Sequence, residues 1–130
     1  MERLQQRIKS AEKPLSAFSE LVDVKEPTTV ERDALIQRFK FSSEICFKTA
    51  KQFLYDKKGI DAASPKGVIR SLRENSILNE EEAIKGIRMV DDRNLTVHTY
   101  NEEVALKIQA SLKDYYLLLL TIIERMKASI

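Results

Sequence analysis

The chain has 130 residues, of which 43% are hydrophobic and 32% are charged, and its formal net charge is +2 at pH 7. This composition excludes a disordered chain, and the small net charge does not indicate the strongly basic face of most nucleic-acid-binding domains. A single Cys46, no recognisable secretory signal and apolar runs too short to span a bilayer predict a cytoplasmic protein that makes no contact with a membrane. We expect residues 1–130 to form a single helical domain.

Hydrophobic spacing predicts a first helix over residues 1–22, with a kink or restart at Pro14 because proline removes a backbone donor. A second helix is predicted over residues 30–57, opened by a capping box between Thr28 and Glu31. The positions expected to be buried are Leu4, Ile8, Ala11, Leu15, Phe18 and Val22 on the first helix, and Leu35, Phe39, Ser42, Cys46, Ala50 and Phe53 on the second.

Two shorter helices are predicted after Gly59, a glycine placed to stop the second helix in the left-handed conformation. Ser64 caps the third helix and Pro65 occupies its first turn, where the missing donor costs nothing. Asn79 and Glu82 open the fourth. Its apolar stripe is expected to contain Ala83, Ile84, Ile87 and Val90.

A long fifth helix is predicted over residues 102–128, capped either by Thr99 with Glu102 or by Asn101 with Glu103. Its stretch DYYLLLLTII is apolar almost all round, which predicts a second buried face and hence a homodimer. No segment has the period of a strand. The expected fold is therefore all-α: an antiparallel up-and-down four-helix bundle with an additional short helix.

The stretch DDRNLTVHTYNEE holds the only histidine, His98, at the corner between the fourth and fifth helices. In one continuous helix Arg93 and His98 would lie about 140° apart, so they converge only if the chain bends between them, as the caps predict. Imidazole, guanidinium and free helix N–H groups at one point would suit a phosphate. Two other interpretations stay open: a capping or packing histidine, and an Arg93 that pairs with Asp91, Asp92 or Glu103 in a surface network.

Other chemistry finds little support in the sequence. The three glycines are isolated, so there is no glycine-rich phosphate loop. One histidine and one cysteine cannot make a zinc site, and we expect neither a metal nor a cofactor. Cys46 lies on an apolar face, as a small buried hydrophobe rather than a nucleophile would. Glu44 and Lys48, four residues apart, predict a solvated ion pair, with a role inside the bundle as the alternative.

Three stretches, RDALIQRFKFSSEICFKTAKQFL, SPKGVIR and DDRNLTVHTY, together resemble the nucleotidyltransferase substrate-binding protein family. That family is a branch of the HEPN superfamily of small helical bundles, and the resemblance, over roughly residues 30–125, is to its HepT-like toxins. Arg93, four intervening residues, His98, one more residue and Tyr100 match the Arg-x4-His-x-Tyr motif of the superfamily. Phe47 departs from the expected tryptophan, a change that concerns packing.

The resemblance implies a HEPN-like homodimer made together with a separate minimal nucleotidyltransferase protein. It implies a metal-independent ribonuclease toxin in which His98 is the general acid or base and Arg93 holds the scissile phosphate, with Asn94 as a second polar ligand. In such toxin–antitoxin pairs the nucleotidyltransferase silences the ribonuclease by transferring AMP to the motif tyrosine, here Tyr100. The alternatives are a non-catalytic subunit that binds nucleotide or substrate for the partner enzyme, and a purely structural dimer.

Overall fold

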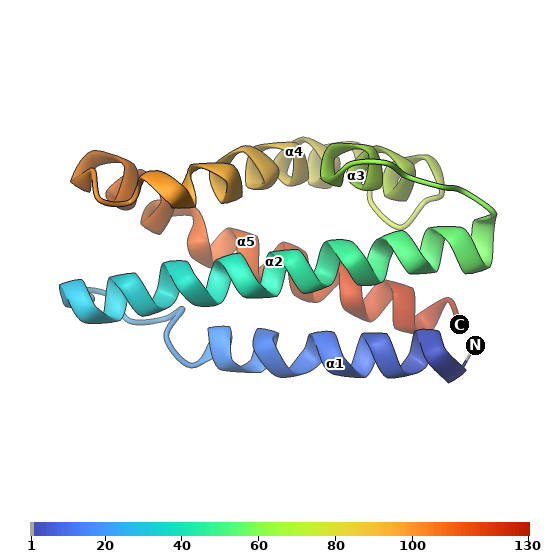
Figure 1. The fold of residues 1–130 in the computed structure, drawn as a ribbon, viewed down its shortest axis with the longest axis horizontal. Helices are drawn as coiled ribbons and strands as arrows, with labels where there is room; N and C mark the ends of the chain where they lie inside the picture. Colours follow the sequence, from blue (N-terminus) through green and yellow to red (C-terminus); the bar gives the residue numbers. More distant parts are fainter. Residues whose placement is uncertain (1) are drawn as a thin grey trace.

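The computed structural model describes residues 2–130, which form five α-helices, one short 3-10 helix and the segments between them (Figure 1). No strand occurs among these residues, which confirms the all-α prediction. The elements are α1 (Glu2–Ser19), α2 (Thr29–Lys58), α3 (Pro65–Glu74), α4 (Glu80–Asn94), the 3-10 helix η1 (Leu95–His98) and α5 (Glu102–Ala128).

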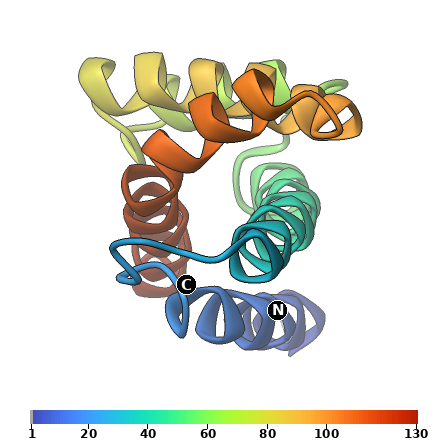
Figure 2. The same ribbon diagram turned by 90° about the vertical axis from the view of Figure 1, so that its left-hand side faces the viewer.

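The helices α1, α2, α4 and α5 surround one core, and the end-on view in Figure 2 shows them on its four sides. Neighbours in this ring run in opposite directions, so the expected antiparallel four-helix bundle is confirmed, and the short α3 packs beside α4 as the additional helix. The first turns of α5 lie beside α4 and η1, and its later turns lie beside α1. As a result, the corner between α4 and α5 lies at the opposite end of the bundle from the two chain termini.

Side-chain caps set the ends of the helices as the sequence predicts. Thr28 and Glu31 form the capping box of α2, with the Thr28 Oγ1 accepting from the Glu31 N–H at 3.1 Å and the Glu31 carboxylate accepting from the Thr28 N–H at 2.9 Å. Asn79 and Glu82 make the same arrangement before α4. Gly59 ends α2 with φ of 66°, a conformation that glycine adopts without steric cost.

The predicted apolar stripes of α1 and α2 are buried, with one exception. Val22 lies beyond the end of α1 and is only half-buried, because this helix ends three residues earlier than predicted. The helix also continues through Pro14, so the expected restart there is wrong. Figure 1 shows α1 as one uninterrupted ribbon.

On α4 the expected stripe is wrong at Ile84, which is 59% exposed. The buried face of this helix uses Gly86 and Met89 instead. A Cβ atom at Gly86 would lie 2.9 Å from the side chain of Ile69, so the glycine allows α3 and α4 to approach closely. Residues two apart on an α-helix point about 200° apart, so a helix that buries Gly86 turns Ile84 away from the core.

The last helix contributes a long buried stripe, including Ile108, Leu112, Tyr115, Leu119, Ile122 and Met126. Two of its other apolar residues, Leu106 and Leu117, are about half exposed in the single chain. These two leucines are the exposed large apolar side chains of α5 among the described residues, and the homodimer expected from a second buried face stays a prediction. No helix in the described part of the chain is both long enough and apolar enough to cross a bilayer.

Candidate functional site

The corner between α4 and α5 is built differently from the predicted one. The backbone of Asn94 and Leu95 stays helical, with φ and ψ of −65° and −28° and of −75° and −9°, so η1 directly continues α4. The predicted bend between Arg93 and His98 is therefore wrong. The chain turns only afterwards, before Asn101, whose side chain caps α5 by accepting from the Glu103 N–H at 3.0 Å.

Threonine hydroxyls explain why the helix tightens here instead of ending. The hydroxyl of Thr96 donates to the Arg93 carbonyl at 2.7 Å, and that of Thr99 donates to the Thr96 carbonyl at 3.2 Å. Carbonyls at the end of an α-helix lose their partner four residues further on, and these two hydroxyls give such carbonyls an additional donor. The β-branched hydroxyl residues in LTVHT thus carry the chain through one 3-10 turn.

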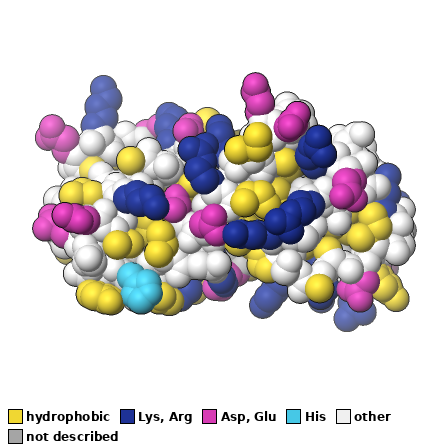
Figure 3. Space-filling view, turned by 90° about the horizontal axis from the view of Figure 1, so that it is seen from above, with side chains coloured by type: hydrophobic (Ala, Val, Ile, Leu, Met, Phe, Trp, Pro, Cys, Tyr) yellow, Lys and Arg dark blue, Asp and Glu magenta, His cyan; other side chains and the backbone are white. Residues whose placement is uncertain are grey.

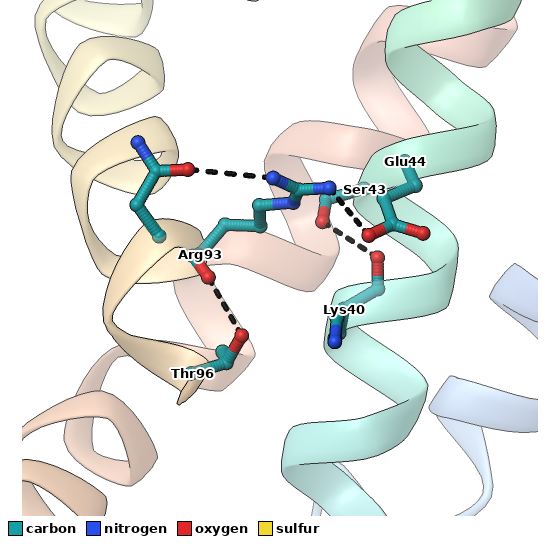
Figure 4. Close-up of polar contacts among 6 residues, drawn as sticks. Lys40, Ser43, Glu44, Arg93 and Thr96 are labelled. Carbon is teal, nitrogen blue, oxygen red and sulfur yellow. Dashed lines mark hydrogen bonds and ion pairs between the residues drawn. The ribbon is translucent and has the colours of Figure 1, made fainter. Parts of the chain in front are cut away.

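The Arg93 side chain crosses from α4 to α2, as Figure 4 shows. Its Nη2 pairs with the Glu44 carboxylate, and its Nη1 donates to the Asn94 Oδ1 at 3.3 Å. The side chains of Arg93 and Glu44 are 28% and 31% exposed, so the ion pair is partly shielded from water. Arg93 and Glu44 pair with each other. The surface network considered for Arg93 and the pair expected between Glu44 and Lys48 therefore do not form.

A hollow of about 360 Å³ opens beside this pair, lined by Glu44, Phe47, Lys48, Pro65 and Arg93. The Nε of Arg93 is buried and has no hydrogen-bond partner among the described residues. Phe47 is 7% exposed at its floor, which agrees with a packing role at the position where the family resemblance leads us to expect tryptophan. The hollow combines a guanidinium, an ammonium and an apolar floor.

Asp92, one residue before Arg93, is 6% exposed and accepts a hydrogen bond from the Tyr115 hydroxyl at 2.6 Å. Burial raises the pKa of Tyr115, and the hydrogen bond to Asp92 raises it further. Asp91 pairs instead with Lys66 of α3 at 2.7 Å. The last turn of α4 is therefore tied to α2, α3 and α5 at once.

His98 and Tyr100 lie on the outside of the corner and contact each other. The His98 Nδ1 and the Tyr100 hydroxyl are 3.2 Å apart, and the two rings meet edge to face with centroids 5.8 Å apart. Tyr100 is 85% exposed, and the neighbouring Val97 is 64% exposed. Figure 3 shows the histidine at the surface beside hydrophobic atoms, near one end of the molecule. No hydrogen bond joins His98 to Arg93 within the chain.

The N-terminus of α5 does not provide the free phosphate-binding end that the sequence suggested. Its first turn carries Glu102 and Glu103. Carboxylates there already interact with the positive end of the helix and would repel a phosphate. Of the three expected components, the guanidinium and the imidazole lie near the corner, and the helix end is occupied.

The predicted role of Cys46 as a small core residue is confirmed. The thiol is buried, and burial raises its pKa to about 12, far above the range in which a thiolate nucleophile forms. Within residues 2–130 no three side chains of the metal-binding types gather into one cluster.

Glu44 is a residue of the site whose partner sequence reasoning missed: the expected pair with Lys48 is wrong, and the alternative role between helices of the bundle agrees with the pair to Arg93. The available signal was its position: a charged residue among Ile45, Cys46 and Phe47, on a helix whose neighbouring face is apolar. A charge in such surroundings needs a partner. The partner, Arg93, lies 49 residues further along the chain, so spacing within α2 could not reveal it.

Comparison with known proteins decides the family. The family model described as nucleotidyltransferase substrate binding protein like matches residues 6–128. The chain belongs to this family. A crystal structure of a Thermus thermophilus protein is 47% identical in sequence, with a TM-score of 0.88 over 90% of this chain and 98% of that one.

A second structural relative comes from Haemophilus influenzae. The structure of that protein is described as revealing the fold of a substrate binding domain of a nucleotidyltransferase. It has a TM-score of 0.65 and 24% identity over 97% of this chain and 98% of that one, so the likeness supports the fold. No curated protein matches the chain.

Proposed function

We propose that this chain is the ribonuclease subunit of a two-component system, a HEPN-like homodimer whose partner is a separate minimal nucleotidyltransferase. The observation that supports this best is the exposed contact between the His98 Nδ1 and the Tyr100 hydroxyl, 3.2 Å apart. An imidazole, the side chain used most often as a general acid or base, and a phenol that accepts a covalent modifier lie together, open to a large substrate.

In this proposal His98 moves the proton in RNA cleavage. Its Nδ1 faces Tyr100, so its Nε2 is the atom that faces the RNA. One imidazole takes the proton of a ribose 2′-hydroxyl, whose oxygen attacks the adjacent phosphorus. The 5′-oxygen leaves and takes a proton from an imidazolium, which yields a cyclic phosphate and a free 5′-hydroxyl. The step uses general acid–base catalysis and needs no metal.

Arg93 would stabilise the charge that develops on the phosphate, with Asn94 as a second polar ligand. No hydrogen bond joins Arg93 to His98 within one chain, so the proposed site requires a dimer that brings Arg93 of one copy beside His98 of the other. The exposed apolar side chains of Val97, Leu106 and Leu117 are candidates for that interface. Burying such residues is what a self-association would gain.

Tyr100 would be the off switch. Transfer of AMP from ATP to its hydroxyl joins the tyrosine oxygen to the α-phosphorus and releases pyrophosphate. The phenol is 85% exposed, so a second enzyme can reach it. A bulky anion bound there would replace the hydrogen bond to His98 and repel the RNA backbone.

The test is RNA cleavage by the chain purified without its nucleotidyltransferase, in the presence of a chelator. We expect cleavage by the wild-type dimer and a loss of at least about a hundredfold in His98→Ala, the usual contribution of a general acid or base. Arg93→Ala should lose a similar factor, and the exposed loop variant Lys25→Ala should retain full activity. A folded wild-type dimer that leaves RNA intact would contradict the proposal.

A second candidate function is a non-catalytic nucleotide-binding subunit. The ion pair with Glu44 favours it, because this pair neutralises part of the Arg93 charge that RNA cleavage would need at the phosphate. It predicts that the chain binds a nucleotide in the hollow beside Arg93 and that RNA stays uncut. Arg93→Ala would then abolish nucleotide binding, and His98→Ala would not. A purely structural dimer would show neither activity.

A further inference from the structure

Three neighbouring hollows follow one face of α2 away from Arg93. The first is the hollow beside Arg93. The second has a volume of about 140 Å³ and is lined by Lys48, Lys51 and the segment Ala62–Pro65, among others. The third has a volume of about 300 Å³ and reaches Tyr55. Lys48 lines all three, and Lys51 lines the second and third. The shared side chains place the three hollows next to one another along α2, and we call this row of hollows the α2 track.

The spacing of the residues along α2 explains why the hollows lie in a row. Glu44, Lys48, Lys51 and Tyr55 follow one another at intervals of four, three and four residues, so they form one stripe of α2. At the rise of an α-helix this stripe is roughly 16 Å long. Arg7 of α1 lies across the third hollow from it, so two helices contribute to the track.

The track is positively charged. Lys48, Lys51 and Arg7 make no ion pair with any carboxylate of the described residues, unlike eight other basic side chains of the chain. Of the two carboxylates that line the hollows, Glu44 is already paired with Arg93, and only Asp61, exposed at the far end, is unpaired. An excess of unpaired cations in a concave surface attracts a polyanion.

The track also offers an aromatic face. Tyr55 is 61% exposed and stacks on no other ring among the described residues. The second hollow has an apolar floor that includes Phe47 and Val68. Cations that follow a backbone together with an exposed aromatic ring for a base are what a single-stranded nucleic acid needs.

We propose that the α2 track binds single-stranded RNA, with phosphates at Lys48, Lys51 and Arg7 and a base stacked on Tyr55. The inference rests on the proposed function for the class of its ligand and for the start of the track at Arg93. An acidic protein surface would use the same cations, but a row of unpaired cations that ends at an unstacked ring is the arrangement that single-strand binding sites combine. The track extends the contacts of the RNA beyond the bonds that are cut.

The test measures fluorescence anisotropy of a short single-stranded RNA whose 2′-O-methyl sugars prevent cleavage, bound to the full chain over a series of salt concentrations. Lys51→Gln and Arg7→Gln should each lower the slope of log affinity against log salt by about 0.7, the contribution of one phosphate contact on a single strand. Lys25→Gln, which removes an equally exposed and unpaired lysine before α2, should leave the slope unchanged.

Tyr55→Ala should weaken binding roughly tenfold, and Tyr55→Phe should bind like the wild type because the ring is retained. Full affinity in Lys51→Gln, Arg7→Gln and Tyr55→Ala together would overturn the proposal. Unchanged RNA affinity with loss of co-purifying nucleotidyltransferase would overturn it as well and assign the track to a protein partner.

The outcomes separate the track from the cleavage chemistry, because the probe cannot be cut. A chain that binds through the track but cuts no RNA refutes the ribonuclease and keeps the track. A chain that cuts RNA but binds it equally well in all track variants refutes only the track.

Discussion

The two halves of the Arg-x4-His-x-Tyr motif are held in opposite ways. Arg93 lies in the last turn of α4, partly buried and paired with Glu44, next to an Asp92 that Tyr115 holds from α5. His98 and Tyr100, one turn further on, are exposed and bonded only to each other. The first half is a fixed part of the bundle, and the second half is a surface.

This difference indicates in which half the positions of the side chains depend on a binding partner. A side chain held by neighbours on several helices keeps its position whether or not a ligand is present. An exposed histidine and tyrosine acquire defined surroundings only when another molecule covers them. We therefore expect changes in the Arg93 half to affect folding and those in the His98 half to affect function alone.

The largest effect on stability is expected from Tyr115→Phe. This change leaves the buried Asp92 without its hydroxyl donor, with only Lys107 at 3.7 Å to compensate. An unsatisfied buried group costs about 1–3 kcal/mol, which urea unfolding would measure. The matched change Tyr116→Phe removes a hydroxyl that makes no hydrogen bond to the described residues, and it should shift stability far less. Equal effects in the two variants would mean that Asp92 is not held as described.

A smaller loss is expected from Arg93→Ala, because the ion pair with Glu44 is partly open to water. The free energy of unfolding should fall by about 1 kcal/mol, and Glu44→Gln should fall by less, since its amide still accepts a hydrogen bond from the guanidinium. Urea unfolding of both variants gives the comparison. A larger loss of stability in Glu44→Gln than in Arg93→Ala would show that Arg93 is not the main interaction partner of Glu44.

The surroundings of Arg93 should also give the stability of the chain a dependence on alkaline pH, through Tyr115. The raised pKa of Tyr115 means that the folded chain favours the protonated phenol, so this contribution to stability is fully present below the ordinary value of 10.0. It is lost as the pH rises above that value towards the raised pKa of the folded state. Stability should therefore fall more steeply between neutral and alkaline pH in the wild type than in Tyr115→Phe. Parallel curves would contradict the assignment.

The smallest effects on stability belong to the exposed half. His98→Ala and Tyr100→Phe remove no buried contact, and each should leave the free energy of unfolding within about 0.5 kcal/mol of the wild type. Thermal unfolding checks this. A loss comparable to that of Arg93→Ala would mean that the corner is a packing feature, and the distinction between the two halves would fail.

Most of the fold could be predicted from sequence because its signals are local. The caps at Thr28, Ser64 and Asn79 and the stop at Gly59 each depend on residues within one turn, and all four are confirmed. Ile84 was misplaced because the face that α4 buries depends on Gly86 admitting Ile69 of another helix, which is a tertiary contact.

The candidate site was predicted only in part for the same reason. The residues Arg93, His98 and Tyr100 could be selected from their pattern, but the bend between the first two was wrong. Thr96 and Thr99 bond to carbonyls in the preceding turn and continue the helix, an effect that cap signals alone do not reveal. The pairing of Arg93 with Glu44 joins two helices far apart in the sequence, so no local pattern could supply it.

One measurement tests the central claim, that the exposed corner both cuts RNA and is switched off there. The purified chain is incubated with its nucleotidyltransferase and ATP, and samples taken over time are assayed for RNA cleavage and for AMP mass on Tyr100. The account predicts that cleavage falls in proportion as the modified fraction rises, and that His98→Ala cuts no RNA at any time. Undiminished cleavage by fully modified chain, or no cleavage by the unmodified dimer, would contradict it.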